Sequence, residues 1–177
     1  TNSIKLPYSC TLDCNGYTIR TNPTRGNGLN VNAIGTENQI LTVKNGTLLH
    51  YEIGIRVSAG GVIVSNMTIV AYGGAPIGLY DTNIKYTDVN LIENATLVSE
   101  NWGCITFNLA DQDMTGTGIT IRDSALIASK AGGNNLFIAR ASQPGTVTLG
   151  TNVDLYTYKT SVFSSVDMAG VEPLKLD

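Results

Sequence analysis

The chain has 177 residues, a formal net charge of −3 and a charged fraction of only 14%. Its 11 basic residues are scattered, without a Lys/Arg cluster, which argues against nucleic-acid binding through phosphate neutralisation and against a charge-driven membrane contact. No apolar run approaches the roughly 20 residues that a membrane-spanning helix needs. The length suits a single domain, so we expect one domain with neither nucleic acid nor membrane as a partner.

Six times along the chain, a strand of alternating apolar and polar residues runs into a small turn residue. These turn residues are Gly16, Asn45, Asn66, Asn94, Asp123 and Asn152. Three residues after each of them stands Ile or Leu: Ile19, Leu48, Ile69, Leu97, Leu126 and Leu155. A repeat of 21 to 29 residues built from strands and turns is typical of a β-solenoid.

The turn column has a physical cause. A sharp bend between two strands needs a residue that tolerates a positive φ, and Gly, Asn and Asp are the residues that do. Asn side chains stacked in successive coils can also hydrogen-bond along the column, which satisfies polar groups in a tight bend. We therefore predict an asparagine ladder.

Strands precede each turn with one face toward the core, because apolar residues recur with period two. Two residues before the turns stand Cys14, Val43, Val64, Ile92 and Ile121, and four residues before them stand Leu12, Leu41, Val62, Asn90 and Ile119. The last coil departs from this pattern, since Gly150 takes an apolar position while Val147 and Leu149 are apolar. We predict a one-residue bulge there.

Each coil then carries a further strand, often opened by Gly, whose outward side chains should stack into one surface. The predicted outward positions are Asn30/Asn32, Arg56/Ser58, Tyr80/Thr82, Thr106/Asn108, Phe137/Ala139 and Phe163/Ser165. Amides, hydroxyls and aromatic faces in a row suit a sugar chain. The alternative is a sheet face covered by solvent or by another subunit, and outward Phe137 and Phe163 indicate such an interface.

Single residues add little chemistry. Cys10 and Cys14 point the same way four residues apart on one strand, too far to bridge, and we interpret the three cysteines, with Cys104, as buried thiols. The single histidine, His50, rules out a zinc pattern and is interpreted as a structural residue. Trp102 either stacks on a sugar or seals a coil edge. We expect neither metal nor cofactor.

Three segments carry a resemblance to a known superfamily. Thr11–Ile19 (Thr-Leu-Asp-Cys-Asn-Gly-Tyr-Thr-Ile) looks like the opening coil of right-handed parallel β-helix proteins of the pectin-lyase-like superfamily. Val64–Ile69 and Ile92–Leu97 resemble its internal coils. The resemblance implies a right-handed β-helix over about residues 4 to 166, but the superfamily spans lyases, hydrolases, phage tailspikes and virion decoration proteins, so the fold implies no reaction.

Enzyme motifs of that superfamily are not matched. The nearest fragments to the hydrolase motifs, Asp81-Thr-Asn83 and Asp111-Gln-Asp113, differ from them. Arg56 is a candidate base of the lyase type, without a flanking acidic cluster. The catalytic candidates for a polysaccharide lyase or glycosidase are therefore Arg56, Asp81, Asp111 and Asp113, of which the last two have a spacing that a glycosidase permits.

The sequence as a whole predicts an all-β, single-domain, right-handed parallel β-helix of about six coils. The domain covers residues 1–177, with core coils over about 4–166 and an extended exit over 167–177. We expect a non-enzymatic virion or cell-surface component, tailspike-like or capsid-decorating, that is trimeric and docks protein or host glycan. The expected ligand-binding residues are Asn30, Asn32, Arg56, Tyr80, Trp102 and Asn108. The alternative is a secreted or phage-borne polysaccharide lyase or glycoside hydrolase.

Overall fold

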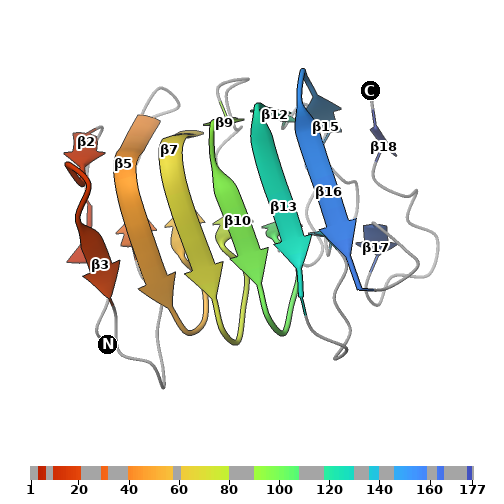
Figure 1. Cartoon of the computed structure of the whole chain (residues 1–177), viewed down its shortest axis with the longest axis horizontal. Helices are drawn as coiled ribbons and strands as arrows, with labels where there is room; N and C mark the ends of the chain where they lie inside the picture. Colours follow the sequence, from red (N-terminus) through yellow and green to blue (C-terminus); the bar gives the residue numbers. More distant parts are fainter. Residues whose placement is uncertain are drawn as a thin grey trace.

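The described part of the chain is all-β and parallel throughout, stacked along one long axis (Figure 1). The computed structural model describes residues 4–6, 10–20, 29–31, 40–57, 61–79, 90–107, 118–129, 136–139, 146–158, 163–165 and 175–176. The N-terminal strands lie at one end of the stack and the C-terminal strands at the other. This confirms the predicted parallel β-solenoid.

The shorter of two sheets contains seven three- or two-residue strands in the order β1-β4-β6-β8-β11-β14-β17. Their bounds are β1 (Ile4–Lys5), β4 (Leu29–Val31), β6 (Ile55–Val57), β8 (Ile77–Leu79), β11 (Ile105–Phe107), β14 (Phe137–Ala139) and β17 (Phe163–Ser165). Every neighbouring pair is parallel.

The longer sheet contains eleven strands and carries the turn column. Its strands are β2 (Cys10–Asp13), β3 (Thr18–Arg20), β5 (Ile40–His50), β7 (Gly61–Ala71), β9 (Leu91–Glu93), β10 (Thr96–Ser99), β12 (Gly118–Arg122), β13 (Ser124–Ala128), β15 (Thr146–Leu149), β16 (Val153–Thr157) and β18 (Lys175–Leu176). β5 and β7 run through the turn without interruption, whereas in the other coils the turn divides the strand in two.

Three turns of the solenoid are described through both sheets without a break: 40–57, 61–79 and 90–107. The described residues therefore show about three turns, and the predicted number of about six coils is not confirmed. On either side, shorter described segments extend the long sheet and the short sheet in register. The sequence repeat thus predicts the architecture correctly, while the total number of coils stays a prediction.

The core lies between the two sheets and is filled by stacked columns of aliphatic side chains. The column three residues after the turns pairs in register from Ile19 to Leu155, as predicted. Its four central members are fully buried, namely Leu48, Ile69, Leu97 and Leu126. Ile19 and Leu155, at the two ends of the column, are half-buried, and among the described strands each has a paired neighbour on one side only.

The turn column adopts the left-handed backbone that the sequence predicts. φ is 59° at Asn45, 51° at Asn66, 47° at Asn94, 48° at Asp123 and 52° at Asn152. These values explain the residue choice, because a β-branched or bulky side chain is strained in this region.

The first turn differs from the others. Asn15 (φ 47°) and Gly16 (φ 81°) are both left-handed, and the Tyr17 N–H donates to the Cys14 carbonyl at 2.8 Å, which makes an Asn-Gly turn. Two extra residues are accommodated, since Asp13 pairs with Lys44 while Thr18 pairs with Thr47.

This insertion corrects the predicted register of the first strand. Leu12, not Cys14, pairs with Val43, and Cys10, not Leu12, pairs with Leu41. All three cysteines are free thiols, as predicted. Cys14 and Cys104 are buried, and Cys10 is half-buried.

The predicted bulge at Gly150 is confirmed. Ile121 pairs with Leu149, but Ser124 pairs with Val153, so one additional residue lies on the C-terminal strand between these two pairs. The Gly150 N–H donates to the Ile121 carbonyl at 2.7 Å, which holds the extra residue against the neighbouring coil. Bulges of this kind re-aim the residues that follow them.

Phe137 corrects the predicted outer surface of the short sheet. It pairs with Ile105 and is fully buried in the core cluster, so its predicted outward position is wrong and it cannot serve as an interface residue. Phe163 pairs with Phe137 along the backbone. The neighbouring positions that do face away from this core, Thr106 and Ile138, are also buried, at 1% and 2% exposure.

Candidate functional site

The asparagine side chains of the turn column form a directional ladder. Asn45 Nδ2 donates to Asp13 Oδ1 at 3.1 Å, Asn66 Nδ2 donates to Asn45 Oδ1 at 3.1 Å, and Asn94 Nδ2 donates to Asn66 Oδ1. Each amide therefore donates to the coil before it. The ladder begins at a carboxylate, and the pKa of Asp13 is lowered by the Asn15 N–H first and then by Asn45 and Lys44.

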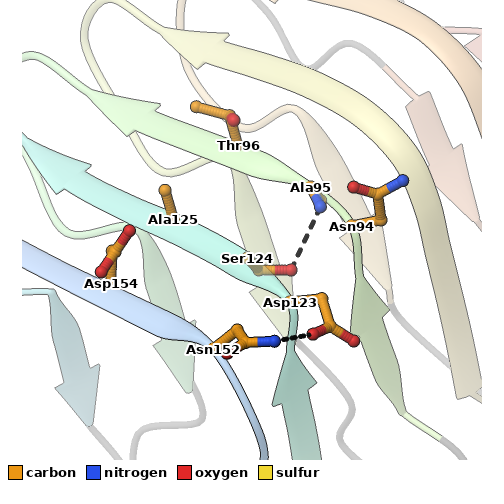
Figure 2. A pocket seen from close by; sticks show the side chains of 8 residues that line it. All are labelled: Asn94, Ala95, Thr96, Asp123, Ser124, Ala125, Asn152 and Asp154. Carbon is orange, nitrogen blue, oxygen red and sulfur yellow. Dashed lines mark hydrogen bonds between the residues drawn. The ribbon is translucent and has the colours of Figure 1, made fainter.

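The ladder is interrupted between Asn94 and Asp123. A carboxylate has no donor, so Asp123 cannot donate to the Asn94 amide oxygen in the way that the other column members do. It accepts instead, from Asn152 Nδ2 at 2.9 Å and from Thr151 Oγ1 at 3.5 Å. Asp123 thus begins a second ladder segment on the same column, and Figure 2 shows its hydrogen bond from Asn152.

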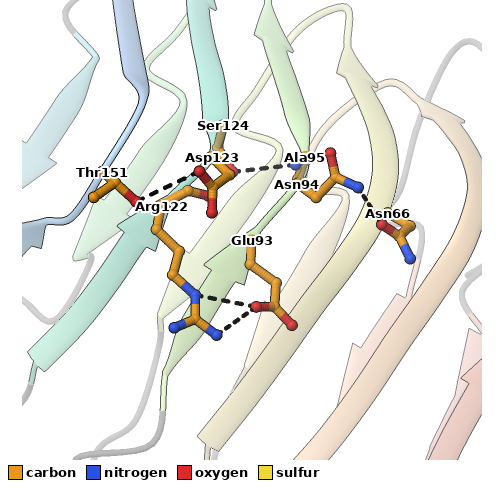
Figure 3. A network of polar contacts seen from close by, with 8 residues as sticks. All are labelled: Asn66, Glu93, Asn94, Ala95, Arg122, Asp123, Ser124 and Thr151. Carbon is orange, nitrogen blue, oxygen red and sulfur yellow. Dashed lines mark hydrogen bonds and ion pairs between the residues drawn. The ribbon is translucent and has the colours of Figure 1, made fainter.

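Ser124 bridges the interrupted position beneath the column. The Ala95 N–H donates to Ser124 Oγ at 3.1 Å, and the hydroxyl donates to the Arg122 carbonyl at 2.6 Å (Figure 3). Ser124 is only 5% exposed, so its hydroxyl gives the Ala95 N–H an acceptor inside the turn and is itself satisfied by the Arg122 carbonyl.

A second regular row is interrupted on the same coil. Two residues after the turns, the outward positions pair in register across the long sheet: Thr18, Thr47, Thr68, Thr96, Ala125 and Asp154. Threonine thus gives way to a single methyl group at Ala125, which leaves space between Thr96 and Asp154 (Figure 2).

These two interruptions coincide in a surface hollow of about 330 Å³. It is lined by Asn94, Ala95, Thr96, Asp123, Ser124, Ala125, Asn152 and Asp154. β10, β13 and β16 supply its floor, and the left-handed turns supply one rim (Figure 2). Amides, hydroxyls and carboxylates therefore converge on the one outward position that has only a methyl group.

The charge of the hollow is negative. Asp123 and Asp154 are its two ionisable lining groups. The nearest cation in sequence, Arg122, is engaged elsewhere, because its Nη2 and Nε atoms lie 2.6 and 3.1 Å from Glu93 Oε2. Figure 3 shows this ion pair joining β12 to β9, directly beside the interrupted step between Asp123 and Asn94.

Tyrosines continue the same surface along β16. Asp154 and Tyr156 alternate outward on β16, about 7 Å apart along an extended strand, and Tyr158 follows directly after the strand; the two tyrosines are 65% and 66% exposed. β16 is an edge strand, because it pairs with β13 alone among the described strands. The hollow therefore opens beside two aromatic faces that are accessible to a ligand.

Among the sequence-predicted site residues that the structure describes, Asn30 and Arg56 lie side by side on neighbouring strands, and neither lines the hollow. Asn32, Tyr80, Asp81, Asn108, Asp111 and Asp113 lie outside the described residues. Arg56 is half-buried on β6, and the Asn30 backbone pairs with it in register. Trp102 is half-buried at the corner after β10, where its backbone N–H donates to Ser99 Oγ at 3.1 Å. These residues stay predictions.

The buried titratable groups are poor reagents. Burial lowers the pKa of His50 to about 3 and raises the pKa of Cys104 to about 12. The Cys104 thiol also points at the Leu97 and Ile127 carbonyls, at 3.6 and 3.4 Å. Neither residue lines the hollow, so neither supplies it with a general base or a thiolate nucleophile.

Comparison with known proteins gives no relative from which to transfer a function. No family model matches the chain, and neither a curated protein nor a solved structure matches it. In the described ranges no helix is long and apolar enough to cross a membrane. The same ranges hold no group of three or more His, Cys, Asp or Glu side chains placed to bind a metal ion.

Proposed function

We propose that the protein is a non-enzymatic, adhesive β-solenoid that binds a glycan chain on the outer face of its long sheet. The observation that carries the proposal is the hollow at Ala125, which is lined by amides, hydroxyls and carboxylates and lies beside exposed Tyr156 and Tyr158. Sugars present hydroxyls on their edges and apolar C–H faces, so they suit a surface that combines paired polar groups with aromatic rings.

The shape of the site supports adhesion rather than tight capture of a small molecule. Ligand pockets that bind tightly enclose most of the ligand surface, whereas this hollow is open to solvent on the face of the long sheet. A single contact of this kind is weak. We propose that several copies act together, as in a trimer, because linked weak sites gain affinity through effective concentration.

The finer identity that we propose is a right-handed, pectin-lyase-like β-helix of about six coils that serves on a virion or a cell surface. The support is the resemblance of Thr11–Ile19, Val64–Ile69 and Ile92–Leu97 to coils of that superfamily, together with the low charge of the chain. Proteins of this fold include tailspikes and decoration proteins that dock host glycan or protein, and this proposal extends that role to the present chain.

A polysaccharide-cleaving enzyme is the second candidate, and one observation favours it. Asp123 and Asp154 both line the hollow, and glycosidases use two carboxyl groups across the scissile bond. Asp123 Oδ1, however, accepts hydrogen bonds from Asn152 and Thr151. These contacts favour a fixed carboxylate that holds the turn over an acid that must deliver a proton.

Glycan binding can be tested by screening oligosaccharides against the wild-type chain and against Tyr156→Ala. We expect the substitution to weaken binding about ten-fold, since an aromatic contact is worth on the order of 1 kcal/mol or more with its buried area. Tyr17→Ala is the matched control, because Tyr17 is also strongly exposed, at 72%, but lies on the first turn.

The outcomes separate the candidates. Binding that depends on Tyr156 but not on Tyr17, without release of shorter sugars, supports the adhesive function. Release of products that Asp123→Asn and Asp154→Asn abolish would instead establish the enzyme. Absence of binding to any glycan in the screen would overturn the proposal.

A further inference from the structure

We infer that the hollow at Ala125 selects a glycan that carries positively charged amino sugars. This inference rests on the glycan-binding function proposed above and names the class of sugar. It follows from the charges that line the hollow, from the geometry that fixes them there, and from the neutrality of the sheet around them.

The carboxylates are the only formal charges on the lining. The eight lining residues include Asp123 and Asp154 and contain no Lys, Arg or His. Arg122, next to Asp123 in the chain, is held in two contacts by Glu93, so these two side chains cancel each other beside the site. Among the described residues, the lining therefore presents two carboxylates to a ligand and no cationic side chain.

The two carboxylates are positioned differently. Asp123 is fixed in a left-handed turn and oriented by Asn152 and Thr151. Asp154 projects from the exposed face of β16, one strand across from the methyl group of Ala125. An ammonium group above Ala125 would lie between them, with the Asn94 and Asn152 amides and the Thr96 hydroxyl available for neighbouring sugar hydroxyls.

Charge then decides among otherwise similar sugars. An ammonium group on the ring gains charge-assisted hydrogen bonds to carboxylate oxygens, which are stronger than neutral ones. An N-acetylated ring offers an amide without the charge, and a uronic acid brings a third carboxylate into the hollow. The expected order of affinity is amino sugar, then N-acetylated sugar, then uronic acid.

The test uses three hexasaccharides as probes, namely of glucosamine, of N-acetylglucosamine and of galacturonic acid, titrated calorimetrically into the full chain at pH 6. We expect the glucosamine hexamer to bind about ten-fold more tightly than its N-acetylated form, which corresponds to one charge-assisted contact. Raising the ionic strength from low to high should reduce this preference, because exposed charges are screened.

Two substitutions and a control locate the effect. Asp154→Asn keeps the shape of the hollow and should remove most of the preference for glucosamine. Glu52→Gln removes one negative charge from an exposed corner outside the hollow and should leave the preference unchanged. Ala125→Thr continues the threonine row into the hollow and should abolish binding of both hexamers while the fold is retained.

The failures of the two proposals differ. Equal affinity for the glucosamine and N-acetylglucosamine hexamers, unaffected by Asp154→Asn, would overturn the charge selection and leave glycan binding standing. Tighter binding of the galacturonate hexamer would also overturn it. Failure of all three hexamers, together with failure of the wider glycan screen, would overturn the proposed function and this inference with it.

Discussion

His50 ends β5 with its ring inside the solenoid, at 1% exposure, and neither ring nitrogen has a hydrogen-bond partner within the described structure. It occupies an inward column whose other members are small, such as Ala71 and Ala128. Gly54 packs against it so closely that a Cβ there would lie 2.6 Å from His50 Nε2. The neutral ring is therefore the form that the fold accepts.

We predict that His50 makes the protein less stable as the pH falls from about 6.5 toward 3. Its pKa is lowered from 6.5 to about 3 by burial, so in this window the unfolded chain takes up a proton that the folded chain does not. The contribution is complete above pH 6.5 and declines by about 1.4 kcal/mol per pH unit below it. Urea unfolding of the wild type and of His50→Leu between pH 7 and 4.5 measures it.

The comparison concerns slopes rather than absolute stabilities, since the Leu substitution itself changes packing. His50→Leu should show a clearly flatter pH dependence above pH 4.5, where carboxyl groups contribute little. Equal slopes for the two proteins would show that His50 is solvated or paired in the folded state.

Substitution of two glycines by alanine should have opposite effects on stability. A Cβ on Gly74 would fall on the backbone carbonyl of Glu52 in the adjacent corner, whereas a Cβ on Gly118 would meet nothing within 4 Å. We expect Gly74→Ala to destabilise by about 1–3 kcal/mol or more through forced backbone displacement. Gly118→Ala should be neutral or stabilising by about 0.4–1 kcal/mol, because it restricts the unfolded chain. Thermal unfolding of both variants distinguishes a general intolerance of substitution from this specific contact.

At the scale of the element, the direction of the asparagine ladder explains its interruption. Each Asn both donates to the preceding coil and accepts from the following one, whereas an Asp can only accept. Asp13 and Asp123 therefore each begin a segment. The turn tolerates either residue, because both adopt the left-handed backbone.

We predict that Asp123→Asn joins the two ladder segments and stabilises the protein. The new amide can donate to Asn94 Oδ1 while its oxygen still accepts from Asn152, and one such hydrogen bond contributes about 0.5–1.5 kcal/mol. Asn66→Asp is the opposite change, since it removes the donor to Asn45 and places a carboxylate beside that amide oxygen. Denaturant unfolding should place the two variants on opposite sides of the wild type, and the same shift for both would contradict the directional ladder.

The sequence predicts those features of the elements that recur in every coil. The turn column and the column of Leu and Ile are visible because the same physical demand recurs in every coil. The two-residue insertion in the first turn cannot be predicted from the repeat, because it preserves the alternation of Cys10, Leu12 and Cys14 while shifting their strand partners by two residues. The inward orientation of Phe137 cannot be predicted either, because Leu136, Phe137 and Ile138 are three consecutive apolar residues and the sequence does not show which of them face the core.

The candidate site was missed for the opposite reason, since it consists of departures from the repeat. Asp123 in a column of Asn, and Ala125 in a row of Thr, are both readable in the sequence. The sequence does not show that these two departures form one hollow with Asp154, because this depends on the register that joins Thr96, Ala125 and Asp154 across three strands. The Gly-led strands, in contrast, form the short sheet, whose outward Thr106 and Ile138 are buried.

At the scale of the whole molecule, a solenoid differs from a globular domain because each coil contacts only its neighbours. Its stability is then close to a sum of coil and interface contributions. The central column shows the consequence: Leu97 is fully buried between β7 and β13, whereas Leu155 on β16 is half-buried and pairs on one side only among the described strands. The C-terminal coil that carries Asp154 and Tyr156 should therefore open more readily than the centre.

We predict that Leu97→Ala costs about 2–5 kcal/mol, as expected for a large cavity in a packed core, and lowers amide protection in the coils on both sides of β10. Leu155→Ala should cost less, because part of its side chain is already in contact with solvent, and should lower protection mainly in β16. Hydrogen exchange followed by mass spectrometry measures both patterns on the same peptides. Equal loss of protection along the whole stack for both variants would mean that the solenoid unfolds as one unit, and the hollow would then be as rigid as the core. If the C-terminal coil opens alone, a bound glycan should protect β16 selectively, since it stabilises only the state in which Asp123, Ala125 and Asp154 lie together.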